Sequence, residues 1–168
     1  MPVQPATNIF EKHNHRRCLK GGMDEARALC QTQGLRLTPV RARVLEILLE
    51  SHKALGAYDI LAILDMDGMG RQPPVVYRAL EFLVQSGLVH RLEKLNAFAA
   101  CCHQGSAEGR GHEPMFLICT QCRQVAETSL KEVEGSIEKC AAALGFEVQS
   151  RVVELIGRCP ACQGGAGL

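Results

Sequence analysis

From Asp24 to about Gly87 the hydrophobic residues recur every three or four positions, the spacing of one face of an α-helix. Gly34, Thr38-Pro39 and Asp67-Gly68 interrupt this pattern, and such residues are typical of helix ends, helix starts and turns. The pattern therefore predicts four short helices. Their inward faces are formed by Ala26, Leu29 and Cys30; by Val40, Val44, Ile47 and Leu48; by Ile60, Leu61 and Leu64; and by Val76, Leu80 and Leu83.

After the fourth helix the pattern predicts two short strands, Leu88–Leu92 and Ala97–Cys101, joined by a tight turn near Asn96. Helices followed by such a hairpin, or wing, form a winged helix-turn-helix. In that architecture the N-terminal residues of the last helix meet base edges in the major groove of DNA. Residues 1–22 show no sustained period, so we expect them to form a flexible arm before a DNA-binding domain over 23–101.

Residues 102–168 predict a second, smaller unit of mixed helix and strand. A polar, Gly-rich loop over 102–114 precedes two strands, Met115–Ile118 and Gln124–Thr128. A helix from Leu130 to Leu144 and a last strand, Phe146–Ile156, follow. Such a unit is too small for a large core, and modules of this kind often become stable by pairing exposed strand edges in a dimer. We therefore expect an α+β chain whose second domain dimerises.

Four cysteines in this second domain form two Cys-x-x-Cys pairs: Cys119 with Cys122, and Cys159 with Cys162. Two thiolates of one such pair can bind a metal ion from the same side, and Zn²⁺ takes four ligands at about 2.3 Å. The spacing predicts one structural zinc site that closes around residues 123–158. Two disulfides, or thiols paired by chance, are the alternatives. Nine cysteines, an odd number, favour a reducing compartment.

The composition narrows the class of protein. A hydrophobic fraction of 46% argues against a disordered chain, and a net charge of +1 means that DNA binding would depend on local basic patches. Aromatic residues make up 4% and there is no Trp, which argues against base stacking on single strands. The chain starts without a leader pattern and has no apolar run of about 18 residues. We expect a soluble cytoplasmic protein without a membrane partner.

The order of these elements, a winged helix followed by a strand and helix unit between two Cys pairs, resembles the ferric uptake regulator superfamily. Within it the chain is most similar to the zinc uptake regulators, over Asp24 to Cys162. Members are dimeric, metal-responsive transcriptional repressors, so the resemblance implies palindromic operator DNA, control of zinc uptake genes and no enzymatic activity. Besides the Cys pairs, it rests on Leu35-Arg36-Leu37-Thr38-Pro39-Val40-Arg41, Ala57-Tyr58-Asp59 and Pro74-Val75-Val76-Tyr77-Arg78-Ala79-Leu80.

The resemblance also implies a second, zinc-sensing site, so that two Zn²⁺ ions per chain are expected. Its ligands would be His90, Cys101, His112 and Glu127. His90 and Cys101 belong to the wing and the other two to the second domain, so that filling the site would set the angle between the domains. A thiolate favours Zn²⁺ over Mn²⁺ or Mg²⁺. Cys102 could replace Cys101, and a third metal site could involve His103 or the N-terminal His13, His15 and Cys18.

The chain departs from the family pattern at two positions. Val75 stands where a Thr is common after the Pro of the recognition helix, which removes a hydroxyl that could cap the helix or donate to a phosphate. Ser150 stands where the family often has a His in the last strand, which weakens the case for a third ion at His103.

Five residues are candidates for DNA contacts. Arg78, in the first turns of the predicted recognition helix, could bind the O6 and N7 of a guanine. Tyr58 and Tyr77 could reach thymine methyl groups or phosphates, and Arg36 and Arg41 phosphates near helix starts. A surface salt bridge from Arg78 to Glu81 is the alternative.

Three other functions remain open at this point. A sister regulator that senses iron or peroxide would share the fold, although the thiol of Cys101 argues against it. A zinc hydrolase would need an open coordination position for water, which Cys101 would fill. A structural zinc module that binds protein partners would not need the helix-turn-helix signature, and specific binding to palindromic DNA would distinguish the two.

Overall fold

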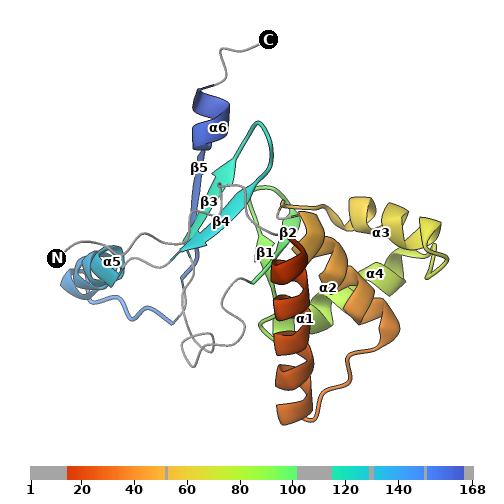
Figure 1. Cartoon of the computed structure of the whole chain (residues 1–168). Coiled ribbons are helices and arrows are strands. Elements are labelled where there is room, and N and C mark those ends of the chain that lie inside the picture. Colours follow the sequence, from red (N-terminus) through yellow and green to blue (C-terminus); the bar gives the residue numbers. More distant parts are fainter. Residues whose placement is uncertain (1–14, 52, 102–114, 129–130, 150, 165–168) are drawn as a thin grey trace.

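The chain forms a helical unit and a sheet unit that meet at a two-stranded hairpin (Figure 1). The computed structural model describes residues 15–51, 53–101, 115–128, 131–149 and 151–164. The mixture of helix and sheet confirms the expected α+β class. The elements are α1 (His15–Thr32), α2 (Pro39–Ser51), α3 (Ala57–Met66), α4 (Pro73–Gln85), β1 (Val89–Leu92), β2 (Ala97–Ala100), β3 (Met115–Cys119), β4 (Val125–Thr128), α5 (Lys131–Ala143), β5 (Val153–Gly157) and α6 (Pro160–Gln163).

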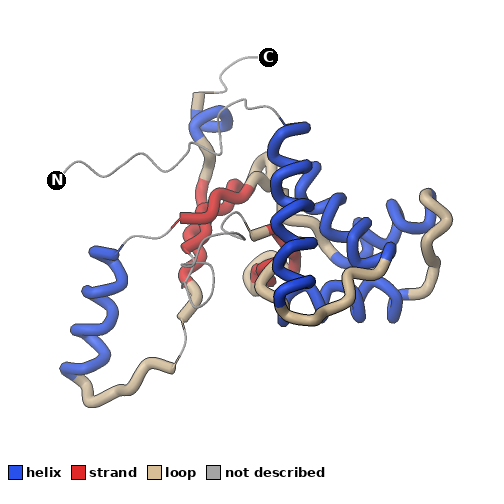
Figure 2. The backbone as a smooth tube through the Cα atoms, turned by 60° about the horizontal axis from the view of Figure 1, so that its bottom comes forward, coloured by secondary structure: helices blue, strands red, loops and turns tan. Residues whose placement is uncertain are grey.

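The N-terminal unit, residues 15–101, is built around one hydrophobic core. The stripes expected from helical spacing are confirmed, because α1 to α4 turn the same residues inward and β1 and β2 close one end. Figure 2 shows the four helices packed together as one body. The largest fully buried side chains of this core include Leu45, Leu48, Ile60, Leu64, Leu80 and Leu83.

Helix α1 starts earlier than expected. Residues 15–22, assigned to a flexible arm from the sequence, form its first turns, whereas residues 1–14 lie outside the described part of the chain. Leu19 packs against the core and Met23 is buried, so the apolar face continues toward the N-terminus. Gly22 faces α2 so closely that a Cβ atom would lie 3.0 Å from Leu49. Gly22, one of the two glycines that suggested a break, therefore allows close packing of α1 against α2.

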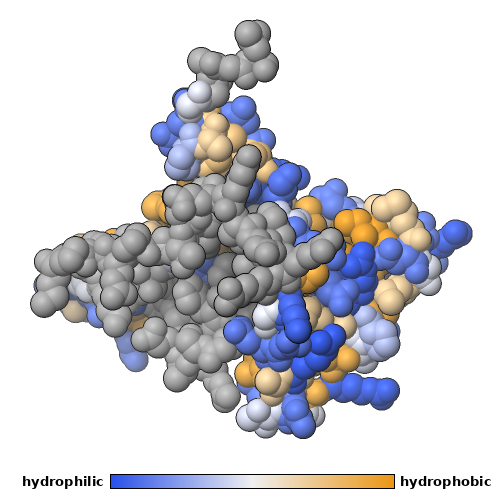
Figure 3. All heavy atoms as spheres, viewed as in Figure 1, coloured by the Kyte–Doolittle hydropathy of each residue, from blue (hydrophilic) through white to orange (hydrophobic). Residues whose placement is uncertain are grey.

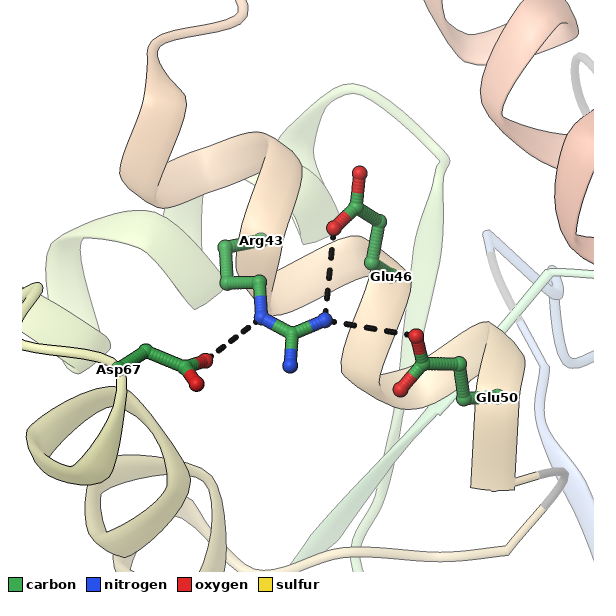
Figure 4. A network of polar contacts seen from close by, with 4 residues as sticks. All are labelled: Arg43, Glu46, Glu50 and Asp67. Carbon is green, nitrogen blue, oxygen red and sulfur yellow. Dashed lines mark hydrogen bonds and ion pairs between the residues drawn. The ribbon is translucent and has the colours of Figure 1, made fainter.

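Arg43 ties helix α2 to the turn that follows α3 (Figure 4). Its Nε donates to Asp67 at 2.7 Å, and one terminal nitrogen lies 3.4 Å from both Glu46 and Glu50. The hydrogen bond to Asp67 is the main reason that the pKa of Arg43 is raised above its usual value. The network holds the end of α3, and therefore the start of the connection to α4, against α2.

The wing, strands β1 and β2, is an antiparallel hairpin that pairs His90 with Ala99. Asn96 adopts a left-handed conformation, with φ of 45°, as the expected tight turn requires. Leu55 extends the hairpin on its other side through two backbone hydrogen bonds to Phe98, at 3.0 and 2.8 Å. The amide of Cys101 donates to Leu88 at 3.0 Å, so this residue continues the ladder beyond β2.

The C-terminal unit, residues 115–164, contains a sheet of order β4-β3-β5, with β4 antiparallel and β5 parallel to β3. The last strand is shorter than expected, since residues 146–149 are not part of it. Among the described residues, parallel pairing with β3 extends over Met115–Cys119, which corresponds to β5 at Val153–Gly157. Helix α6 was not expected from the sequence; it is a single turn that begins at Pro160.

Helix α5 connects β4 to β5 and stands apart from the other elements in both views (Figures 1 and 2). Several apolar residues in and after this helix are exposed, including Val133, Leu144 and Phe146. On β5, which forms one edge of the sheet, Leu155 and Ile156 are also about half exposed, at 47% and 49%. Within the described chain, this unit therefore leaves much of its apolar surface uncovered.

The two units meet at a second, smaller hydrophobic cluster. Leu92, Ala97 and Ala99 of the wing pack there against Phe116 and Ile118 of β3. Ala54, just after α2, is fully buried in the same cluster and donates its amide to the carbonyl of Arg123 at 3.0 Å. One face of the wing is thus covered by the sheet, which places the ends of both units side by side.

Candidate metal centres and nucleic-acid interface

The four cysteines of the two Cys-x-x-Cys pairs come together at one end of the sheet. Cys119 ends β3, Cys122 follows on a tight turn, and Cys159 and Cys162 lie at the start and within the single turn of α6. Arg123, with φ of 61°, closes the first turn and donates its amide to Cys119 at 3.0 Å. All four are free thiols, so the expected alternative of two disulfides is not formed.

The sulfur positions fit a tetrahedral zinc ion. All four sulfur atoms lie within 4.8 Å of one another, and those of Cys122 and Cys159 are 3.7 Å apart. Zinc–sulfur bonds of about 2.3 Å place neighbouring sulfurs of a tetrahedron roughly 3.8 Å apart. The geometry matches the site predicted from the spacing.

The surrounding backbone prepares one of these thiols as a thiolate. Hydrogen bonds from the backbone of Cys122 and Cys159 lower the pKa of Cys119 to about 6, against the opposing effect of burial. By contrast, hydrogen bonding to Cys159, together with burial, raises the pKa of Cys162 to about 12. Four sulfur atoms this close cannot all carry negative charge without a cation among them. Zn²⁺ would supply that positive charge.

A second cluster lies where the wing meets the sheet. His90 from β1, Cys101 just after β2 and Glu127 from β4 present one donor atom each within 4.8 Å of one another. The distance from Glu127 Oε1 to His90 Nε2 is 3.3 Å, and to Cys101 Sγ it is 3.8 Å. Tetrahedral bonds of about 2.0–2.1 Å to N and O and about 2.3 Å to S give separations of roughly 3.4 and 3.6 Å.

The polar residues of this second cluster are deeply buried. Glu127 is 4% exposed and Cys101 is 2% exposed, and a carboxylate at such depth is costly unless partners neutralise it. The ring of Phe116 lies against His90, with centroids 5.1 Å apart and planes inclined by 60°. Phe116, which the sequence did not single out, therefore holds the imidazole in place. The sequence shows it only as one apolar residue of a strand.

The structure brings together three of the four residues expected to form this second site. His112 lies outside the described residues, as do Cys102 and His103 and the N-terminal His13. Nitrogen, sulfur and oxygen donors in one buried cluster suit Zn²⁺, whereas Mg²⁺ and Mn²⁺ prefer oxygen ligands.

Three of the five residues expected to contact DNA, Tyr58, Tyr77 and Arg78, lie on exposed parts of α3 and α4. Arg78 is exposed, and none of the ion pairs among the described residues involves it, so the alternative pairing with Glu81 is not formed. Tyr58, 69% exposed, and Tyr77, 48% exposed, line one hollow of about 520 Å³ between α3, α4 and the wing. Hydrophobic and hydrophilic side chains are interspersed over the visible face of this unit (Figure 3).

The structure gives Arg36 and Arg41 different surroundings. Arg36 is exposed before α2, whereas the guanidinium of Arg41 lies 3.6 Å from the centre of the Phe82 ring. Arg41 also donates to the carbonyl of Arg36 at 2.7 Å. This geometry favours Arg41 as a brace between α4 and the segment that carries Arg36, rather than as a free phosphate donor. At the start of α4 the N-cap Gln72 makes no side-chain capping bond.

No helix in the described part of the chain is long and apolar enough to cross a membrane.

The chain is similar to zinc and ferric uptake regulation proteins. The family model described as "Ferric uptake regulator family" matches residues 32–156. The zinc uptake regulation protein of Escherichia coli strain K12 is 35% identical over 138 residues, which cover 82% of this chain and 79% of that protein. The ferric uptake regulation protein of Cupriavidus metallidurans is 32% identical over 132 residues, covering 75% of this chain and 85% of that protein.

Solved structures show the same fold. A zinc uptake regulator complexed with zinc and DNA superposes with a TM-score of 0.77 at 33% identity, covering 90% of this chain and 97% of that one. Holo XcZur gives 0.73 at 39% identity, over 86% and 99% of the two chains. Apo XcZur gives 0.50 at 36% identity, over 88% and 99%. The structure therefore resembles the metal-bound forms more than the apo form of a similar chain.

Proposed function

Because this chain belongs to the ferric uptake regulator family, we propose that it is a zinc-responsive, dimeric transcriptional repressor that binds operator DNA when its sensing site is filled. One observation carries this proposal above the others. Donors from the wing and from the sheet, His90, Cys101 and Glu127, converge on one buried point at the boundary between the two units. A site that needs ligands from both units forms when the units lie against each other.

The four cysteines have a different role in this proposal. Cys119, Cys122, Cys159 and Cys162 all belong to the C-terminal unit, so an ion bound among them stabilises that unit without reporting on its position relative to the wing. An ion among them would join the end of β3 and the turn after it to the α6 turn, and structural zinc ions commonly stabilise small units in this way. We assign these residues to a permanent, structural site.

His90, Cys101 and Glu127, with His112 as the expected fourth ligand, form the sensing site. Zinc bound there would supply the positive charge that lets a buried thiolate and carboxylate lie together. The greater likeness to holo XcZur than to apo XcZur supports an arrangement of the units that belongs to the metal-filled state. A metal that binds this arrangement more tightly than an open one shifts the population toward it. A difference of about 3 kcal/mol would change operator affinity roughly a hundredfold.

DNA reading is proposed to centre on α4. Arg78 is exposed near the start of that helix and takes part in none of the described ion pairs, so it can reach a guanine. Tyr58 and Tyr77 lie beside it around a common hollow, in reach of thymine methyl groups or phosphates. Arg36 contacts phosphate, and Arg41 contributes by holding the segment that carries Arg36.

Dimerisation is proposed to involve the C-terminal unit. β5 is an edge strand with half-exposed Leu155 and Ile156, and α5 exposes apolar residues beyond it. A second copy would cover this surface and would place two recognition helices about one turn of DNA apart, roughly 34 Å. Such a dimer would bind a palindromic operator.

Under this proposal the protein regulates zinc uptake genes, is located in the cytoplasm and is not an enzyme. The described donors of the second cluster are a thiol, an imidazole and a carboxylate, and the thiol would occupy the position that a hydrolase leaves to water. A boundary near residue 101 would separate the DNA-binding domain from the dimerisation domain.

A selection experiment tests the proposed function. We expect the zinc-loaded protein to enrich a palindromic sequence from a pool of random duplexes, and zinc chelation to weaken binding to that sequence about a hundredfold. Arg78→Ala should lower affinity for the selected site by about 1–3 kcal/mol and relax the preference at one base pair. Enrichment that requires Fe²⁺ in place of Zn²⁺ would support an iron sensor, and enrichment without any metal would contradict metal-dependent control.

A further inference from the structure

Three residues on neighbouring strands form a row across the sheet that faces the wing. Phe116 of β3 is paired with Glu127 of β4 on one side and with Glu154 of β5 on the other. Paired residues on adjacent strands point to the same face of a sheet. Glu127 contacts His90 and Cys101, and Phe116 lies against the ring of His90. Glu154 is the remaining member of the row.

Glu154 reaches the turn of the wing. One carboxylate oxygen accepts the backbone amide of Glu93 at 2.7 Å, and the other accepts the amide of Lys94 at 3.0 Å. Both contacts join residues that are about sixty positions apart in sequence, across the boundary between the units. A carboxylate that binds two adjacent backbone amides makes stronger hydrogen bonds than a neutral acceptor.

We propose that Glu154 is a positioning residue that forms a second, metal-independent latch between the wing and the sheet. The inference rests on the proposed zinc-dependent switch and adds to it. The sensing cluster attaches the base of the wing to β4, and Glu154 attaches its turn to β5. The apolar cluster between the wing and β3 lies between these two polar attachments, and an attachment at the far end of the wing restricts its tilt relative to the sheet.

The latch sets how much of the zinc-free protein already occupies the closed arrangement. Because this latch consists of two backbone amides that donate to the carboxylate of Glu154, it forms in the presence and absence of zinc. Removing it lowers the closed population of the zinc-free protein, and a ligand that needs the closed form then binds more weakly by the same factor. Glu154 therefore adjusts the zinc concentration at which the regulator responds. Its strand also belongs to the proposed dimer edge, so the latch connects the wing to the dimer.

Glu154→Ala tests this proposal in the full-length protein. We expect the zinc affinity of the sensing site, measured by competition with a chelator, to fall about tenfold, a change equivalent to about 1.4 kcal/mol. Operator affinity should fall by about the same factor without zinc in that site and by clearly less at saturating zinc, so that zinc dependence increases. A purely structural defect would lower the active fraction and the melting temperature without changing this ratio.

Two further variants control the experiment. Glu93→Ala removes a carboxylate of the same turn, which pairs with Arg91 at 3.2 Å. It keeps the backbone amide that donates to Glu154, so zinc affinity should stay within about twofold of the wild type. Lys94→Pro removes one donor at the second position of the turn, where Pro is well tolerated. It should weaken zinc binding in the wild type and have a smaller effect when Glu154 is already Ala.

The outcomes separate the two proposals. If the wild type binds its selected operator independently of zinc, the proposed function is wrong. If the wild type responds to zinc but Glu154→Ala retains wild-type zinc affinity, or if the Lys94→Pro and Glu154→Ala effects simply add, the latch is overturned.

Discussion

At the scale of single residues, the chemistry depends on polar groups placed where water is excluded. Glu127 is almost fully buried, yet it lies within 3.8 Å of a thiol and 3.3 Å of an imidazole nitrogen. A buried carboxylate without partners would destabilise the fold by several kcal/mol, so its retention indicates a cluster that is neutralised in the working state. The environments of Cys119 and Cys162 also differ. Backbone amides lower the pKa of Cys119, which favours its thiolate, whereas the pKa of Cys162 is raised.

The residue that should decide zinc sensing is Cys101. Cys101→Ser preserves size but replaces the thiolate with a hydroxyl, a poor zinc ligand at neutral pH, so the protein should fold and keep the ion at the four cysteines. Zinc per chain should fall from two ions to one, and the zinc dependence of operator binding should disappear. Metal analysis and fluorescence anisotropy measure the two effects.

Cys102→Ser is the matched control for that variant, since it makes the same chemical change one position along the chain. It should retain both ions and the zinc response. If Cys102→Ser loses the sensing ion while Cys101→Ser retains it, Cys102 rather than Cys101 is the ligand.

At the scale of elements, short helices are oriented by what ends them and what braces them. Helix α4 ends at Gln85; Gly87, just after the C-cap Ser86, has a φ of +72°, and the next amide, Leu88, donates back to Leu83 at 2.9 Å. This reversal leads the chain directly into the wing. At the other end of the helical unit, Arg43 holds the end of α3 against α2. The recognition helix is thereby positioned at both of its connections.

A pair of glycine substitutions tests this view of helix ends. Gly87→Ala forces a Cβ into a left-handed conformation and should lower the free energy of unfolding by about 1–2 kcal/mol. Gly21 lies on an exposed part of α1, where an added Cβ would meet no atom beyond the local helix within 4 Å, so Gly21→Ala should raise stability by about 0.5–1 kcal/mol. Chemical denaturation of both variants gives the comparison. Equal effects at the two positions would show that backbone conformation is not the cause.

At the scale of the whole molecule, two units share a boundary that is partly apolar and partly polar. The wing contributes Leu92, Ala97 and Ala99 to a shared apolar cluster, and Glu154 and the sensing cluster lie at either side of it. An interface of this kind can open and close more readily than a large hydrophobic one. Metal binding at its edge can therefore change the arrangement of the units without unfolding either.

Native mass spectrometry during stepwise chelation tests the arrangement as a whole. We expect a dimer with two zinc ions per chain, from which one ion per chain is lost early and the other is retained. The retained ion should be the one held by four cysteines, because four thiolates bind zinc from a single unit. If no more than one ion per chain is ever present, and that ion resists removal, the protein has a structural site but no sensor. It would then bind DNA or a partner constitutively.

Local patterns in the sequence determined much of this architecture. The inward stripes of α2, α3 and α4, the wing and the order of the C-terminal elements follow from hydrophobic spacing and turn residues, because each depends on neighbours within a few positions. The four-cysteine site also follows from spacing, since two tight turns bring each pair together. The sensing residues were assigned by resemblance to a family and not by any local pattern.

The tertiary structure decided what depends on distant neighbours. The start of α1 at His15 required the core against which Leu19 and Met23 pack, and the length of β5 was limited by its pairing with β3. The contact between Arg41 and the ring of Phe82 depends on the packing of α2 against α4. The row of Glu127, Phe116 and Glu154 exists only because three strands align in one register. Periodicity records which face of an element is buried, whereas the partner on that face is set by packing between elements far apart in the chain.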